Sequence, residues 1–180
     1  MINFGLEKWA NIVISIAIYA VGIFLLIWIT NLLFASWFKR ALNKHEKSLA
    51  LALNSKFDNI KKLFLIMNKL GVEFDQKYLT IIEEIKIEDF KKQNSPECKK
   101  AREQLTYLRD EAVYISRRQQ KLEKNNEFIT AKNNVLEMDV VYRNTVAYYN
   151  ADVLGYNYWI RFLPYRWFWK MLKVKTKDLI

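Results

Sequence analysis

This chain of 180 residues contains few of the residue types that mark turns, disulfides and many metal sites. It has four glycines, two prolines, one cysteine and one histidine. The shortage of glycine and proline favours long helices over a strand-and-turn fold, because these residues separate short elements. The single cysteine, Cys98, excludes an internal disulfide and a Cys-x-x-Cys motif. The single histidine, His45, could bind a metal only with ligands from elsewhere, so we expect a solvated side chain there.

Motifs for catalysis are also missing. The chain has neither a Gly-rich phosphate-binding loop nor a nucleophile elbow. Two pairs of carboxylates, Glu83-Glu84 and Glu88-Asp89, are adjacent in the sequence, and adjacent residues on a helix point in different directions. We interpret them as a solvated face rather than an acid–base pair. We therefore expect no enzymatic activity, no cofactor and no bound metal.

Charge is absent between Lys8 and Lys39, a gap of 39 − 8 − 1 = 30 positions. The centre of this gap, residues 12–29, is almost wholly apolar, and about 20 apolar residues span a bilayer as a helix. Residues 1–40 are therefore predicted to form a short extracellular N-terminus and a transmembrane helix. The alternatives are a buried helix of a soluble core, which is usually shorter, and a signal peptide, which needs a basic start and a cleavage site.

The flanking charges predict the orientation of this helix. Glu7 and Lys8 cancel before it, whereas Lys39, Arg40 and Lys44 follow it. Positive residues concentrate on the cytoplasmic side of membrane helices. We expect a single-pass protein of the cell membrane, with the N-terminus outside and the rest of the chain in the cytoplasm.

Residues 41–164 are predicted to form a helical bundle, because apolar residues recur at alternating steps of four and three. The expected fold is all-α, with an antiparallel bundle of three to four long helices after the membrane helix. The first stripe ends at Gly71, a residue typical of helix ends, and consists of Leu53, Phe57, Ile60, Phe64 and Met67. A short second piece carries Phe74, Tyr78, Ile81 and Ile85, and we interpret residues 86–97 as a loop that leads into the next helix.

Two further helices complete the predicted bundle. Ser95 and Pro96 favour a helix start, because serine can cap a helix and proline is tolerated in its first turn. The stripe of this helix is Ala101, Leu105, Leu108, Ala112, Ile115 and Leu122, with Gln119 as a polar exception. After a turn or cap at Asn125, the last helix is predicted from about residue 128 to 163. Its stripe is Val135, Asp139, Tyr142, Val146, Tyr149, Val153, Tyr156, Ile160 and Leu163.

The last predicted helix contains the pair Tyr-Asn twice, seven residues apart. Seven positions are two helical turns, so Tyr149 and Tyr156 face the same side, within the apolar stripe. Asn150 and Asn157 follow at the flank of the stripe, where an amide can reach a neighbouring helix. We interpret both pairs as packing residues that fix the alignment of the helices. The alternative is a ligand site built from two phenols and two amides.

The spacing Tyr149-Asn150-x-x-Val153-x-x-Tyr156-Asn157-x-x-Ile160, followed by Pro164, resembles the C-terminal signature of the LemA family. Further matching positions are Leu122, Asn125, Phe128 and Asp139. The resemblance implies a bacterial protein with one N-terminal membrane helix, a cytoplasmic helical bundle and no established enzymatic activity. Members are often encoded near a membrane zinc metalloprotease, which makes a membrane protease a candidate partner. The chain departs from the family pattern at residues 119–120, where the family has Tyr-Pro, and at Val146, where it has arginine.

Residues 165–180 form a basic and aromatic tail, and no acidic residue occurs from Trp159 to Lys177. A helix here would place aromatic side chains opposite basic ones, and such amphipathic helices commonly lie on anionic membrane surfaces. The candidates for contact with lipid headgroups are Arg166, Trp167, Phe168, Trp169, Lys170 and Lys173. The alternative is a flap that covers the open end of the bundle.

The formal net charge of +10 favours anionic partners. Anionic lipid headgroups fit the membrane helix and the tail, whereas nucleic acid ranks lower because the chain has no recognition motif. The sequence thus predicts a membrane-anchored scaffold or adaptor, which binds a partner protein or assembles with itself. The alternative is a regulator or cofactor protein of a membrane protease, and a membrane-tethered nucleic-acid-binding protein ranks below both.

Overall fold

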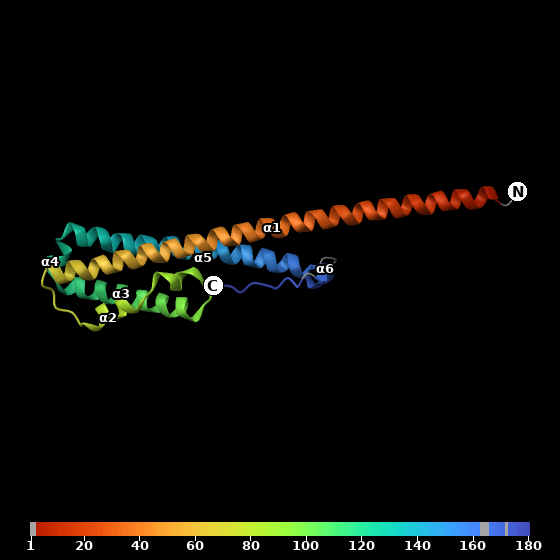
Figure 1. Ribbon diagram of the computed structural model, residues 1–180. Helices are drawn as coiled ribbons and strands as arrows, with labels where there is room; N and C mark the ends of the chain where they lie inside the picture. The colour runs from red at the N-terminus through yellow and green to blue at the C-terminus, as the bar shows by residue number, and fades with distance from the viewer. Residues whose placement is uncertain (1–2, 163–165, 172) are drawn as a thin grey trace.

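The computed structural model describes residues 3–162, 166–171 and 173–180. It also describes the side chains of these residues, except those of residues 3–7, 167 and 168. All regular elements in this part of the chain are helices: α1 (Asn3–Lys69), α2 (Lys77–Glu84), the 3-10 helix η1 (Ile87–Lys91), α3 (Pro96–Arg118), α4 (Gln120–Glu123), α5 (Asn126–Arg161) and α6 (Arg166–Met171). The predictions of an all-helical chain and of one long apolar N-terminal helix are confirmed (Figure 1).

Helix α1 is continuous over 67 residues, which corresponds to about 100 Å at 1.5 Å per residue. It continues from the predicted membrane segment into the rest of the fold because no glycine or proline lies between Gly22 and Gly71. The helix ends where the sequence predicts, at Gly71, whose φ is 65°. The N–H groups of Gly71 and Val72 donate to the carbonyls of Asn68 and Met67 at 3.1 and 3.0 Å. These bonds satisfy carbonyls that a helix end otherwise leaves without partners.

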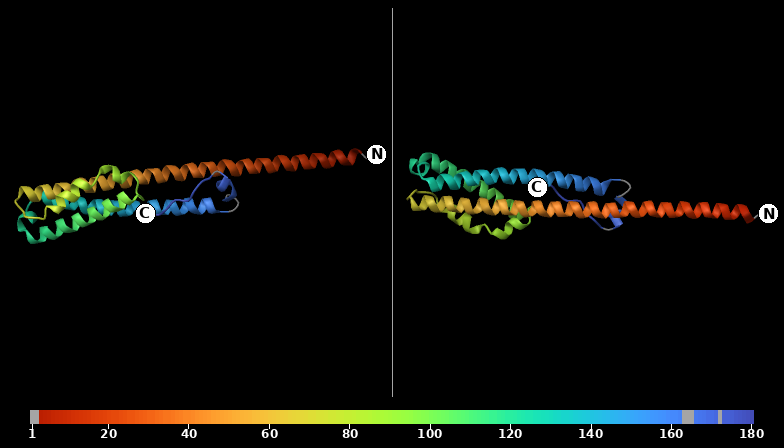
Figure 2. Two further views of the ribbon diagram at one scale, coloured as in Figure 1. Left: turned by 60° about the horizontal axis from the view of Figure 1, so that its bottom comes forward. Right: turned by 90° about the horizontal axis from the view of Figure 1, so that it is seen from above.

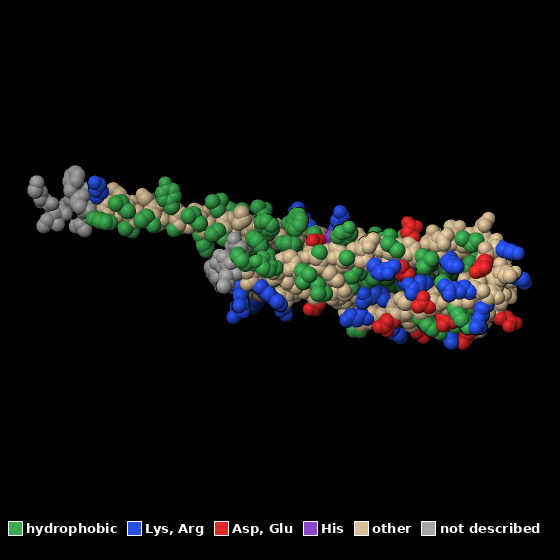
Figure 3. Space-filling model, turned by 180° about the vertical axis from the view of Figure 1, so that it is seen from behind, with side chains coloured by type: hydrophobic (Ala, Val, Ile, Leu, Met, Phe, Trp, Pro, Cys, Tyr) green, Lys and Arg blue, Asp and Glu red, His purple; other side chains and the backbone are tan. Residues whose placement is uncertain are grey.

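The two halves of α1 have different surroundings. Every side chain from Lys8 to Thr30 is exposed, and Asn31 is the first buried one, with 2% of its surface exposed. Leu42 is buried next, and from Leu49 to Met67 buried residues recur at steps of three and four. Figure 3 shows the first half as a projecting rod with mainly apolar side chains, whereas charged side chains gather on the rest of the molecule. The first half is long and apolar enough to cross a membrane.

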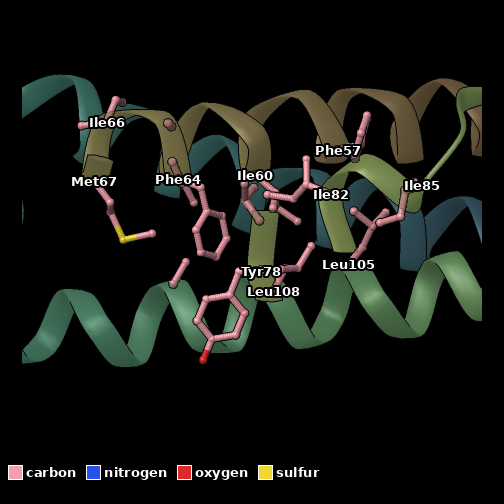
Figure 4. Packing of buried hydrophobic residues seen from close by; sticks show 14 of the residues in the cluster. Phe57, Ile60, Phe64, Ile66, Met67, Tyr78, Ile82, Ile85, Leu105 and Leu108 are labelled. Atoms are coloured by element: carbon pink, nitrogen blue, oxygen red, sulfur yellow. The ribbon is translucent and has the colours of Figure 1, made fainter. Parts of the chain in front are cut away.

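The second half of α1 packs with α2, α3 and α5 around the main hydrophobic core (Figure 4). Phe64 of α1 lies against Phe74 and Tyr78, with ring centroids 5.5 and 5.6 Å apart. Leu105 and Leu108 of α3 are fully buried in the same core. We call residues 42–162, which build this core and its continuation along α1 and α5, the helical body.

Two local structures differ from the sequence interpretation. The segment interpreted as a loop contains η1, whose Phe90 is fully buried and lies 6.3 Å from Phe57 between ring centroids. The helix predicted through Leu122 breaks at Gln119, where φ and ψ of −124° and 93° are extended, so that Leu122 belongs to α4. An unbroken helix would point the polar Gln119 side chain towards the core, whereas the break leaves it exposed.

Helix α5 returns along α1 in the opposite direction. Asn134 donates to Asn59 at 3.4 Å near one end, and Trp159 stacks on Phe34 near the other. After α6 the chain reverses at Lys173, whose φ is 54°. Residues 174–180, which we call the strap, then run back beside α5 without regular secondary structure (Figure 2). The predicted tail helix is thus confined to the six residues of α6.

Candidate functional site

The rings of the twin tyrosines lie in the seam between α1 and α5. Tyr156 is half-buried, and its ring meets Phe38 edge-on with centroids 6.2 Å apart. Tyr149 is buried in a small apolar cluster with Leu42, Leu49 and Val153. Both rings therefore contribute to the contact between the two longest helices.

The side-chain amides of Asn150 and Asn157 bind the strap. Asn157 Nδ2 donates to the carbonyl of Lys177 at 2.8 Å, and its Oδ1 accepts from the N–H of the same residue at 2.9 Å. Asn150 makes the equivalent two bonds to Ile180, at 3.1 and 3.0 Å. The sequence suggested that these amides reach a neighbouring helix, but they satisfy the backbone of an extended segment instead.

Three further polar contacts hold the strap. Lys177 Nζ lies 3.1 Å from Glu46 Oε1, in a pair with about a third of each side chain exposed. The Tyr156 hydroxyl donates to the carbonyl of Lys175 at 3.4 Å. The carbonyl of Asp178 accepts from Asn94 Nδ2, also at 3.4 Å. The strap is therefore bound mainly through its backbone, with one ion pair added.

Glu46 joins the strap to the buried tyrosine. Its Oε1 accepts from the Tyr149 hydroxyl at 3.4 Å as well as from Lys177. Burial, with the negative charge of Glu46, raises the pKa of Tyr149 to about 12. The phenol therefore keeps its proton well into the alkaline range and stays a donor to the carboxylate.

A second polar cluster ties α1, α3 and α5 together. The two carboxylate oxygens of Asp139 lie 2.5 Å from Lys56 Nζ and 2.5 Å from Arg109 Nη1. Burial alone would raise the pKa of Asp139, but the hydrogen bonds and charges of its two partners hold the pKa below its ordinary value. Burial lowers the pKa of Lys56, against the opposing effect of Asp139. Asp139, the acid that matches the family pattern, thus compensates the positive charge of Lys56, which has only 5% of its surface exposed.

The other residues of the family-like motif have structural contacts. Asn125 caps α5, because its Oδ1 accepts from the N–H of Phe128 at 2.9 Å. Four apolar members are buried: Leu122, Phe128, Val153 and Ile160. Pro164 lies outside the described residues.

The candidate membrane-surface residues fall into two groups. Trp169 is only 3% exposed and packs with Ile160, so it fixes α6 on the end of the helical body. The cations of the group are exposed: Arg166, Lys170 and Lys173. The side chains of Trp167 and Phe168 lie outside the described residues.

The single histidine is partnered rather than freely solvated. His45 Nε2 lies 3.2 Å from Asp152 Oδ2, and each side chain is 25% exposed. The imidazole also stacks beside Tyr148, with ring centroids 6.3 Å apart. Within the described residues, no three His, Cys, Asp or Glu side chains group together as metal ligands.

Sequence reasoning missed Lys56 and Glu46, although a signal for both exists. Lys56 stands seven residues after Leu49 and seven before Leu63, and Glu46 stands seven before Leu53. A charged residue in an apolar heptad row predicts a partner on a facing helix. Asp139, an acid within the apolar stripe of α5, is that partner for Lys56.

Comparison with protein-family models found no match, and neither did searches of the curated proteins and of the solved structures.

Proposed function

We propose that this protein is a membrane-anchored scaffold or adaptor of LemA type. The first half of α1 would cross the cell membrane once, with the N-terminus outside. The helical body would stand in the cytoplasm as an antiparallel bundle of three long helices, α1, α3 and α5. Its role is binding rather than catalysis.

The length of the bare part of α1 carries this proposal. From Lys8 to Thr30 there are 30 − 8 + 1 = 23 residues, all with exposed side chains. They span about 35 Å as a helix, close to the ~30 Å thickness of the hydrocarbon layer of a bilayer. Burial begins directly afterwards at Asn31, and Phe34 stacks on Trp159 of α5. Such an apolar rod is unfavourable in water, and a bilayer supplies the apolar surroundings that the rest of the chain does not.

The charge at the inner end of this rod supports the orientation and a lipid partner. Six exposed cations occur on the adjoining parts of α1 and α5, on α6 and on the turn after it: Lys39, Arg40, Arg161, Arg166, Lys170 and Lys173. No acidic residue lies between Lys39 and Lys44 or from Trp159 to Lys177. A wholly basic collar at one end of a membrane helix favours the cytoplasmic side and attracts anionic headgroups.

The continuity of α1 supports a scaffold or adaptor role. A single helix forms the proposed membrane segment and also contributes to the main core, without a linker between the two parts. A partner bound to the helical body would therefore be held at a fixed height and orientation above the membrane. This property serves assembly, and it serves the regulation of a membrane protease equally well.

Accessible-cysteine labelling tests the orientation. Cys98 is fully buried, so Asn3→Cys and Lys61→Cys variants each add one reactive thiol. In intact cells a membrane-impermeant thiol reagent should label the first variant, and label the second only after the membrane is opened. Labelling of Lys61→Cys in intact cells would contradict the proposed topology.

Co-purification from detergent extracts tests the function. A stoichiometric partner protein would support an adaptor, and a protease among such partners would favour the regulator. Defined homo-oligomers would support a scaffold. A chain that purifies only as a monomer, or with bound RNA, would contradict the proposal.

A further inference from the structure

The strap meets the helical body with every third residue. Val174, Lys177 and Ile180 are half-buried, whereas the residues between them are exposed: Lys175, Thr176, Asp178 and Leu179. An extended chain with three residues per turn presents one residue in three to a surface. The strap thus has one inward row of side chains, and the others take no part in the contact.

The spacing of the two asparagines matches this repeat. Seven residues of helix separate Asn150 from Asn157, a rise of about 10.5 Å. Three residues of extended chain, the interval from Lys177 to Ile180, cover roughly 9–10 Å. Each asparagine can therefore bind both the N–H and the carbonyl of one inward residue, as the four bonds show. Bonds of this kind recognise an extended backbone and not a particular side chain.

Three subsites recognise the inward side chains. Val174 packs beside Ile160 and Trp169, at the α6 end of the groove. Lys177 meets the carboxylate of Glu46. Ile180 contacts the apolar cluster formed by Leu42, Leu49, Tyr149 and Val153. The groove therefore selects an apolar residue, then a basic one, then an apolar one, at intervals of three.

The groove is built without the strap. Its asparagines stand on α5 and its carboxylate on α1, and these helices join in the main core, which contains no strap residue. No residue of the strap is fully buried. An open hollow lined by Glu46, Tyr149 and residues 91–95 adjoins the subsite of Ile180, so the surface continues beyond the strap.

We propose that this groove between α1 and α5 is a peptide-binding site for an extended segment of a partner protein with the pattern apolar-x-x-basic-x-x-apolar. The strap occupies the site in cis and must leave before the partner binds. The proposal rests on the adaptor function and assigns it a binding surface. Because the site is open for only a fraction of the time, the apparent dissociation constant of a partner is the intrinsic one divided by that fraction. Loss of the strap therefore strengthens partner binding.

Binding of a labelled peptide tests the site. The probe is a synthetic peptide of residues 173–180, and the receptor is the otherwise complete chain truncated after Lys173, in detergent. We expect saturable binding that weakens at least 10-fold with Asn157→Leu in the receptor. The matched control is Asn144→Leu, an exposed asparagine on the same helix.

Peptide variants test the ligand class. Replacing all four outward residues by alanine should change the dissociation constant less than about 3-fold, because the outward side chains make no contact that the site reads. N-methylation at Lys177 removes one bond to Asn157, and Lys177→Glu reverses the charge facing Glu46. Each of these changes should weaken binding at least 10-fold. Equal binding of all these peptides would overturn the proposal.

The full chain keeps the proposal testable if the truncated chain does not fold. A spin label on Leu179→Cys should be less mobile than the same label on the free peptide, and excess probe peptide should raise its mobility to that of the free peptide. A mobility that does not change at saturating peptide would show that the strap belongs to the core, and the proposal would fail. Homodimers that disappear on truncation would assign the groove to the strap of a second copy instead. If a co-purified partner remains bound to Asn157→Leu, the adaptor function stands and only this site is wrong.

Discussion

Phe34 and Trp159 stack with their ring centroids 4.7 Å apart, and Phe34 stands three residues after Asn31, the first buried residue of α1. This contact joins the last turn of α5 to the helix that we propose spans the membrane. One turn further along α1, Phe38 closes the same seam against Tyr156, with centroids 6.2 Å apart. The junction between the bare segment of α1 and the helical body is thus aromatic, and its close fit can be tested.

Gly155 provides that test. A Cβ added there would stand 3.1 Å from Phe38 Cε1, closer than an ordinary contact, so a large side chain must push the two helices apart. We expect Gly155→Leu to cost about 1–3 kcal/mol, as overpacked sites do. Hydrogen exchange should accelerate in α6 and the strap while the main core keeps its protection. Ala151→Leu, at an exposed position one turn earlier, is the control and should lie within about 0.5 kcal/mol of the parent. Similar exchange in both variants would contradict the tight fit.

Substitutions at Asp139 and at its partner Lys56 are expected to lower the free energy of unfolding by unequal amounts. Asp139→Asn leaves Lys56 buried without its anionic partner, which costs about 3–5 kcal/mol in comparable sites. Lys56→Met leaves Asp139 paired with Arg109 and replaces a buried charge by an apolar chain of similar length, so we expect a change below about 1.5 kcal/mol. Chemical unfolding of both variants under one condition measures the difference. Equal losses would show that neither the lysine nor the carboxylate dominates the cluster.

The same cluster predicts a pH dependence. The pKa of Asp139 is lower in the folded chain than in the unfolded one, so the unfolded state takes up a proton first as the pH falls. The stability that Asp139 contributes is therefore complete above its ordinary pKa of about 4 and is lost below it. The gap in unfolding free energy between the parent and Asp139→Asn should shrink as the pH falls from 5 towards 2. A gap independent of pH would contradict the ion pair.

Two chain reversals share one hydrogen-bond pattern but differ in residue type. After α1, Gly71 has φ of 65°, and after α6, Lys173 has φ of 54°. The N–H groups of Lys173 and Val174 donate to Lys170 and Trp169 at 3.1 Å each, the pattern that also ends α1. A non-glycine residue in this region costs roughly 1 kcal/mol. Lys173→Gly should therefore slow exchange of the strap amides by about 3- to 5-fold.

Gly71→Ala is the reciprocal change. A Cβ on Gly71 meets nothing within 4 Å, so its cost is confined to the backbone and should be about 1 kcal/mol. Thermal unfolding measures it. If Lys173→Gly instead accelerated hydrogen exchange of the strap amides, the Lys173 side chain would have to stabilise the strap by more free energy than its strained backbone costs.

The parts of the fold that the sequence predicts are those fixed by local chemistry. Ser95 caps α3, Asn125 caps α5 and Gly71 ends α1, because each of these signals acts within four residues. The apolar stripes likewise locate the core. The break at Gln119 and the burial of Phe90 cannot be predicted from local sequence, because each depends on how distant helices fit together.

The strap shows the same limit more clearly. The repeat of Tyr-Asn marks a special face of α5, but the partners of its amides lie 20 and 30 residues further along the chain. Nothing local distinguishes an amide that binds a helix from one that binds an extended segment. A period-three pattern of Val174, Lys177 and Ile180 is too short to stand out in a tail whose positive charge favours the interpretation as a membrane-surface segment.

The basic collar can be tested in the full chain, because a fragment that begins after residue 41 would lose Phe34 and Phe38, which anchor the end of α5. Each Lys or Arg near an anionic leaflet contributes about 1 kcal/mol, so Arg166→Glu with Lys170→Glu should weaken the preference for anionic lipid by at least 30-fold. The measurement is the composition of lipid retained by the protein in mixed anionic and neutral nanodiscs. High salt should reduce the difference, because headgroup contacts are screened beyond a Debye length of about 10 Å at 0.1 M salt.

The control carries the same charge change at the other end of the helical body. Lys61 and Lys62 are exposed near the end of α1, more than 20 residues from Lys39, so Lys61→Glu with Lys62→Glu alters the net charge equally without touching the collar. That variant should retain the anionic preference of the parent. A loss of preference in both variants would mean that net charge alone attracts the lipid. No loss in either would leave α6 without contact to headgroups, and the basic end of the helical body would then face solvent or a partner protein.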